Sequence, residues 1–143
     1  MAQLARRQGD EPFGAVLVDA SGAVLEEAVN TKITEQDPTG HAEINLVRAV
    51  TPHLDVDVLR GATLYASTEP CAMCSAAIYW SGIGRVVYAL AAESLLRLIG
   101  DNAAHDVLAL SSREVFARGT RPVQVVGPVL EGEAMAVHEG YWA

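Results

Sequence analysis

Lysine, cysteine and long apolar runs are all scarce in this sequence of 143 residues. Lys32 is the only lysine, and the formal net charge at pH 7 is −8. After Arg121 the chain contains no lysine or arginine at all. Proteins that bind nucleic acids neutralise the phosphate backbone with many basic side chains. The scarcity of basic residues therefore argues against a nucleic acid partner.

No apolar stretch approaches the roughly 20 residues that a membrane-spanning helix requires. The first residues also lack the basic and then apolar pattern of a secretion signal. We therefore expect no membrane partner and a cytoplasmic location. Half of the residues are hydrophobic, and neither a repeat nor a linker interrupts the chain. This length suits one domain with a buried core, so residues 1–143 are expected to form a single domain.

The chain has only two cysteines, Cys71 and Cys74. Residues i and i+3 of a helix lie on the same face, so the two thiols can hold one metal ion. A zinc site made of three or four cysteines is excluded. Alone, a Cys-x-x-Cys pair is also compatible with a redox pair or with two buried thiols.

A histidine and a carboxylate in a second segment give the cysteine pair a chemical context. His41 supplies a third zinc ligand, and three protein ligands leave one tetrahedral position for water, as in catalytic zinc sites. Glu43 is a carboxylate that can take protons from that water and return them. Helix-starting residues 37–40 and 67–70 precede the two segments. We predict one Zn²⁺ per chain at the N-termini of two helices, held by His41, Cys71 and Cys74, with Glu43 as the catalytic residue.

His-x-Glu followed by Pro-Cys-x-x-Cys is a signature of zinc-dependent base deaminases. The chain resembles the cytidine-deaminase-like superfamily, specifically its branch of guanine deaminases, nucleoside deaminases and tRNA-adenosine deaminases. The resemblance rests on these segments: Pro12–Val16, Asn30, Asp37–Thr39, His41–Glu43, Glu69–Cys74 and Ala77–Trp80. The last of them is more similar to guanine deaminases than to the tRNA enzymes.

The resemblance implies an α/β fold, a three-layer α/β/α sandwich around a five-stranded mixed sheet whose last two strands are parallel. The periodicity of apolar residues predicts strands at 15–18, 23–25, 62–66, 85–89 and 123–126. It predicts helices at 2–8, 41–50, 71–81, 92–98 and 131–140. Residues 51–61 are expected to be a connector, and the strand at 62–66 to be buried on both faces.

The resemblance also implies residues that contact the substrate. Phe13 lies in the segment that lines the pocket in similar proteins, with core packing as an equal alternative. Asn30 matches an asparagine that orients the base ring, although asparagine is also a common turn residue. Asp101 lies where guanine deaminases have acidic residues that bind the guanine edge, but Asn102 departs from that pattern, and helix capping is as good an explanation. Independently of the resemblance, the backbone N–H near Ala42 lies at a helix start and can stabilise developing charge.

Residues 131–143 are expected to form a C-terminal helix and tail near the active site. An exposed tryptophan beside a tyrosine is unfavourable unless the rings are covered or cover another group. The tail therefore either packs on its own domain or, as in guanine deaminases, closes the pocket of its own or a partner subunit. In the second case Glu139 and Trp142 contact the substrate.

These observations predict hydrolytic deamination of a small amino-heterocycle, foremost a purine base or nucleoside of the guanine type, as in purine metabolism. The alternatives are cytosine, a triazine or adenosine in tRNA, and a zinc-stabilised structural domain without catalysis. The structural alternative needs a fourth protein ligand, for which the remaining histidines are His53, His105 and His138. A homodimer is also expected, with Tyr79 and Trp80 as core or interface aromatics.

Overall fold

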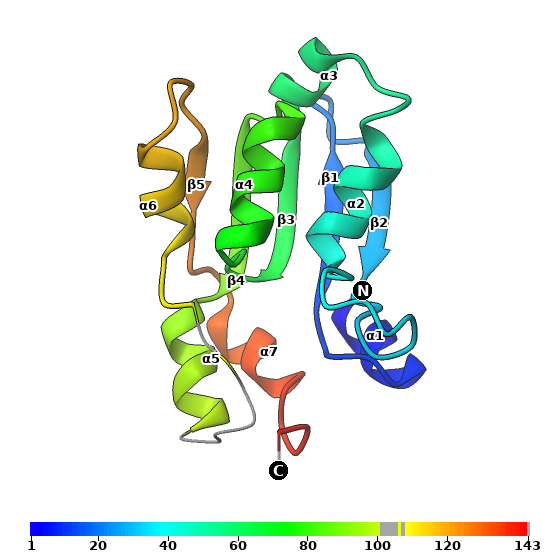
Figure 1. The fold of residues 1–143 in the computed structure, drawn as a ribbon, viewed down its shortest axis with the longest axis vertical. Coiled ribbons are helices and arrows are strands. Elements are labelled where there is room, and N and C mark those ends of the chain that lie inside the picture. The colour runs from blue at the N-terminus through cyan, green and yellow to red at the C-terminus, as the bar shows by residue number, and fades with distance from the viewer. Residues whose placement is uncertain (101–105, 107, 143) are drawn as a thin grey trace.

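The structure, a computed structural model, describes residues 1–100, 106 and 108–142. Its sheet has the strand order β2-β1-β3-β4-β5 (Figure 1). The strands are β1 (Gly14–Val18), β2 (Val24–Val29), β3 (Thr63–Thr68), β4 (Arg85–Leu90) and β5 (Gln124–Val126). Strand β1 pairs antiparallel with β2 and β3, whereas the pairs β3·β4 and β4·β5 are parallel. The predicted α/β fold around a five-stranded mixed sheet is confirmed, and so is the parallel final pair.

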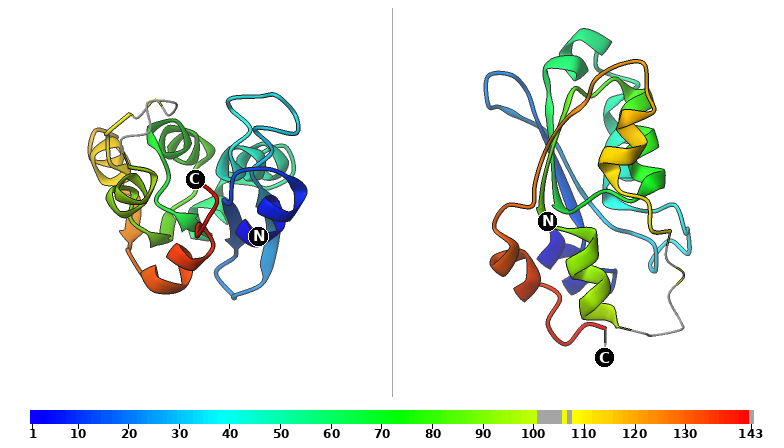
Figure 2. Two further views of the ribbon diagram at one scale, coloured as in Figure 1. Left: turned by 90° about the horizontal axis from the view of Figure 1, so that it is seen from below. Right: turned by 90° about the vertical axis from the view of Figure 1, so that its left-hand side faces the viewer.

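Helices lie on both sides of this sheet. They are α1 (Ala2–Gln8), α2 (Ala42–Val50), α3 (Val56–Gly61), α4 (Ala72–Ser81), α5 (Ala92–Ile99), α6 (Ser112–Ala117) and α7 (Glu131–Ala136). Helices α2, α4 and α6 pack along one face, and α1 and α7 lie on the other side near one end of the strands (Figures 1 and 2). No helix in the described part of the chain is long and apolar enough to cross a membrane.

The buried apolar side chains form one cluster between the sheet and the helices α2 and α4. Side chains of a strand alternate between its faces, so Leu17 of β1 and Leu64 of β3 point into this cluster. Leu46 of α2 and Ile78 of α4 meet them there, and all four side chains are fully buried. The shared core holds α2 and α4 next to each other over β1 and β3. The N-terminal ends of the two helices consequently lie close together.

Three local expectations from the sequence are wrong. The strand at 62–66 is not buried on both faces, because Tyr65 is 43% exposed where α1 and α7 leave part of the second face uncovered. The expected connector contains helix α3, which begins after Asp55. The apolar pattern of the helix at 41–50 favours Ile44, Val47 and Ala49–Val50 as its buried side, whereas in α2 the buried side includes Leu46 and Ala49 is exposed.

Candidate metal centre and active site

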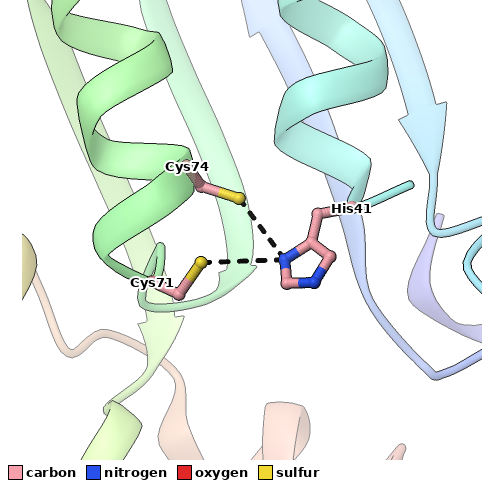
Figure 3. A group of neighbouring side chains, drawn as sticks. All are labelled: His41, Cys71 and Cys74. Carbon is pink, nitrogen blue, oxygen red and sulfur yellow. Dashed lines mark hydrogen bonds between the residues drawn. The ribbon is translucent and has the colours of Figure 1, made fainter. Parts of the chain in front are cut away.

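The residue just before each of two helices supplies a potential metal ligand. His41 is the N-cap of α2 and Cys71 is the N-cap of α4, and both have extended backbone conformations. Neither side chain caps its helix by a hydrogen bond, so both are available for a metal. Cys74 lies one turn into α4 and is buried. Because α2 and α4 are neighbours, the three side chains converge in the space between the helix ends (Figure 3).

The distances between these side chains fit a zinc ion. The Nδ1 atom of His41 lies 3.7 Å from the Sγ atom of Cys71 and 3.5 Å from that of Cys74. Tetrahedral zinc with ordinary Zn–S and Zn–N bond lengths separates sulfur from nitrogen by about 3.6 Å. The three ligand atoms all lie within 4.8 Å of one another. The three side chains are therefore close enough together to bind one zinc ion.

A structural zinc site would need a fourth protein ligand. Within residues 1–100, 106 and 108–142, the group able to hold a metal contains His41, Cys71 and Cys74 and no further residue. His105, which the sequence offered as a candidate, lies outside the described residues. Three ligands leave one position for water or substrate, which favours a catalytic zinc site over a structural one.

Glu43 lies beside the ligands in the first turn of α2. Its side chain is 7% exposed, and its Oε2 atom accepts a hydrogen bond from the Cys74 thiol at 3.5 Å. Burial raises the pKa of its carboxyl group. A buried carboxyl group with a raised pKa next to metal ligands is typical of a catalytic proton carrier.

The three ligand side chains shift one another's pKa values in a way that favours a bound cation. The neighbouring Cys74 thiol and, to a smaller extent, His41 lower the pKa of Cys71 to about 4. The same contact with Cys71, together with burial and Glu43, raises the pKa of Cys74. The hydrogen bond between His41 and Cys71 raises the pKa of His41. The site thus carries a thiolate whose charge a metal ion would compensate.

Asn30 has a buried amide group with no partner for its nitrogen. Its Oδ1 atom accepts the backbone N–H of Lys32 at 3.0 Å, while Nδ2 is buried and makes no hydrogen bond in the described structure. The backbone N–H of Thr31 donates to Gly40 at 2.8 Å, directly before His41. Unpaired buried donors are uncommon. The unpaired Nδ2 of Asn30 lies next to Thr31, whose backbone bond to Gly40 brings this segment close to His41. It therefore indicates a place for a ligand.

The C-terminal tail packs on Phe13. The Phe13 ring lies 5.4 Å from the His138 ring and 6.1 Å from the Trp142 ring, measured between centroids. The Trp142 indole N–H donates to Nδ1 of His138 at 3.2 Å, and Arg6 donates to the Val137 carbonyl at 2.8 Å. In the view from below, the tail runs beneath the ends of α2 and α4 that carry the ligands (Figure 2).

The other residues predicted to contact the substrate are Ala42, Glu139 and Asp101. Ala42 is buried as the first residue of α2, and Glu139 is exposed on the tail. Asp101 lies outside the described residues. No sequence pattern predicts a role for Glu11, which forms a 2.8 Å ion pair with Lys32 and contributes to the raised pKa of His41. No motif marks Glu11, and its only signal is its position just before the Pro12–Val16 segment.

Comparisons with known proteins agree with this geometry. Residues 1–90 match the cytidine and deoxycytidylate deaminase zinc-binding region. The chain is 40% identical over 142 residues to a probable cytosine deaminase of Schizosaccharomyces pombe, covering 99% of this chain and 86% of that protein.

Two further relatives have other substrates in their names. The chain is 45% identical over 78 residues to the guanine deaminase of Bacillus subtilis, covering 54% of this chain and 49% of that protein. It thus spans about half the length of that relative. The chain is also similar to a solved structure from a study of tRNA deaminases that edit adenosine to inosine at the wobble position. The two sequences are 30% identical, and the TM-score is 0.73. The match covers 95% of this chain and 91% of that one.

Proposed function

The chain belongs to the cytidine and deoxycytidylate deaminase family. We propose that it removes an amino group from a small heterocyclic base by hydrolysis. The observation that carries the proposal is the buried Glu43 carboxyl group in contact with Cys74, one of three convergent metal ligands. A zinc-binding domain without catalysis would have no use for a buried carboxyl group at this position.

Each residue of the site has a defined part in this reaction. His41, Cys71 and Cys74 would hold a zinc ion, which when bound would supply Lewis acidity and make water a nucleophile near neutral pH. Glu43 takes one proton from the attacking water and passes it to the ring nitrogen. It then takes the second proton from the added hydroxyl group and passes it to the amino group, which leaves as ammonia as the C–N bond breaks and the C=O bond forms. Both deliveries are needed, because an amidine carbon is a poor electrophile and an amide ion does not leave at neutral pH.

Binding of the base is assigned to residues around this centre. The free Nδ2 of Asn30 donates to a ring acceptor and so orients the base. The backbone N–H of Ala42 lies in the first turn of α2, where amides have no partner within the helix, and stabilises developing negative charge. The rings of Phe13 and Trp142 form an apolar wall that excludes water. We keep Asp101 and Glu139 as further candidates for contacts with the substrate.

Two substrates are the leading candidates. The Ala77–Trp80 segment and the similarity to a guanine deaminase favour a purine base or nucleoside of the guanine type. Cytosine is the second candidate, because the match to a probable cytosine deaminase extends over 99% of the chain and therefore includes the tail. A triazine remains a further small-ring candidate. The net charge of −8 argues against tRNA, whose phosphates bind basic surfaces.

An ammonia-release screen tests the function and chooses between these substrates. The zinc-loaded protein is assayed with guanine, guanosine, deoxyguanosine, adenine, cytosine, cytidine and ammeline, and Glu43→Gln serves as the inactive control. Release from the guanine compounds supports the first candidate, and release from cytosine alone supports the second. A protein that holds one zinc per chain but releases no ammonia from any compound, and binds tRNA in a salt-dependent manner, would contradict the assignment to a small base.

We further propose that residues 1–143 act as one cytoplasmic domain and that two copies associate through α4. Helix α4 contains no charged residue, and Trp80 near its end is 82% exposed. Met73, Ala77 and Trp80 follow the i, i+4, i+7 spacing of a single helix face. An uncharged apolar face is the surface through which two chains of the same strong charge can associate with least repulsion.

A further inference from the structure

Two carboxylates from distant parts of the chain meet at the N-terminus of α5. Glu69, in the loop between β3 and α4, accepts the backbone N–H of Ala92 at 3.3 Å. Glu131, the first residue of α7, accepts the backbone N–H of Ala91 at 3.3 Å and the Ser94 hydroxyl at 2.8 Å. The first amides of a helix lack partners within the helix and favour negative charge. The start of α5 is therefore a junction between two other segments.

On one side of this junction is the metal-binding loop. Glu69 lies two residues before Cys71, and its other carboxylate oxygen accepts the Ser112 amide at 3.1 Å and the Ser112 hydroxyl at 2.7 Å. Its own backbone N–H donates to Leu90 at 2.8 Å. Glu69 thus attaches the loop that carries Cys71 to the first residues of both α5 and α6.

On the other side of the junction is the C-terminal tail. Helix α7 begins at Glu131 and leads directly to His138 and Trp142, which pack on Phe13. Helix α5 itself is lightly held, since Ser94 is its one buried residue. The hydrogen bonds at its N-terminus accordingly join α5 to both the metal-binding loop and the start of α7.

We propose that Glu69 and Glu131 are positioning residues that act in series. Glu69 fixes α5 to the metal-binding loop, Glu131 fixes the tail to α5, and together they keep Trp142 in place relative to the ligands at the start of α4. Links in series have a measurable property: breaking either one disconnects the two ends, so breaking both adds little. Two independent helix caps would instead contribute additively.

The position of the tail is measured by the fluorescence of Trp142, which does not depend on any substrate. In a Trp80→Phe background, Trp142 is the only tryptophan. Acrylamide quenching of Trp142 and bound zinc are then measured for Glu69→Ala, Glu131→Ala and the double variant, because a glutamine oxygen could still accept these hydrogen bonds. Ser94→Ala is a second, milder disruption of the junction. Glu93→Ala on α5 and Glu133→Ala on α7 are matched controls, because both residues are exposed and lose the same charge.

The proposal predicts that each single variant raises the quenching constant by about 2- to 5-fold while zinc is retained, and that the double variant equals the stronger single variant. The two controls stay unchanged. Additive effects of Glu69→Ala and Glu131→Ala, or unchanged quenching in Glu131→Ala and Ser94→Ala, would overturn it.

Kinetics provide a second arm, which rests on the proposed function. With the substrate found in the ammonia screen, KM should rise by about 3- to 10-fold in each variant, with little change in kcat and again no addition in the double variant. A loss of kcat with an unchanged KM would contradict a role in positioning the tail. If the screen finds no substrate, the quenching experiment still tests the positioning role of Glu69 and Glu131. Failure of the proposed function can therefore be distinguished from failure of this proposal.

Discussion

Glu43 combines burial, contact with a ligand thiol and a place in the first turn of α2. Glu43→Gln preserves the shape of the side chain and removes its ability to carry protons. We expect zinc content to persist while kcat falls by about 10²- to 10⁴-fold, the usual contribution of a general acid–base group. The measurement is ammonia release alongside metal analysis. Glu27→Gln, an exposed control, should be unaffected; a Glu43→Gln protein active within a few-fold of the parent would remove Glu43 from the mechanism.

Asn30 offers a second test with a near-isosteric change. Asn30→Asp keeps an oxygen for the Lys32 amide and loses the unpaired Nδ2 donor. We expect kcat/KM to fall by about 10- to 100-fold, the loss of one buried hydrogen bond to a ligand, with zinc retained. Asn45→Asp is the matched control, because the Nδ2 of Asn45 donates to protein atoms. It should lower the melting temperature rather than kcat/KM, and equal behaviour of the two variants would show that Asn30 is structural.

At the scale of elements, the docked tail depends on an uncharged histidine. Burial, with a smaller effect of Arg6, lowers the pKa of His138 from 6.5 to about 4. Neutral His138 is also required to accept the Trp142 indole N–H. A depressed pKa means that this contribution to stability is complete above pH 6.5 and is lost as the pH falls towards 4.

Acidification should therefore release the tail within that window. We expect the emission of Trp142 in a Trp80→Phe background to shift to longer wavelength, and the melting temperature to fall, between pH 6.5 and pH 4. The acidic residues Glu11 and Asp10 also lie near Tyr141 of the same tail. His138→Gln isolates the histidine, and a variant with an unchanged pH profile would refute its role.

The helices that carry the ligands were predictable, and the contacts between loops were not. His41 and Cys71 each follow helix-starting residues, a local signal that places both at N-caps. The exposure of Tyr65 was missed, because an apolar run shows that a strand is hydrophobic but not which helices cover it. The junction of Glu69 with Glu131 lies beyond sequence patterns, since it joins residues that only the complete fold brings together.

At the scale of the whole molecule, the uncharged face of α4 leads to a test of association. Trp80→Glu places a charge on this face and should convert a dimer into a monomer. The measurement is molar mass by light scattering after size-exclusion chromatography. Val24→Glu is the matched control, because Val24 is also an exposed apolar residue but lies on β2. A parent protein that is already monomeric, or a Trp80→Glu variant that stays dimeric, would contradict the proposed interface.

The placement of the ligands at the starts of α2 and α4 makes the metal a cross-link as well as a reagent. His41 is separated by 30 residues from Cys71 and by 33 from Cys74, so a bound ion closes a long loop of the unfolded chain. In the chain-entropy description, closing a loop of this length is worth about 4 kcal/mol. Stability should then rise with the logarithm of free zinc. A series of chelator-buffered zinc concentrations should produce a steady shift of the melting temperature in the parent protein and none in Cys74→Ser. Supply of the metal would thus set not only the rate of the reaction but also how much folded protein exists to perform it.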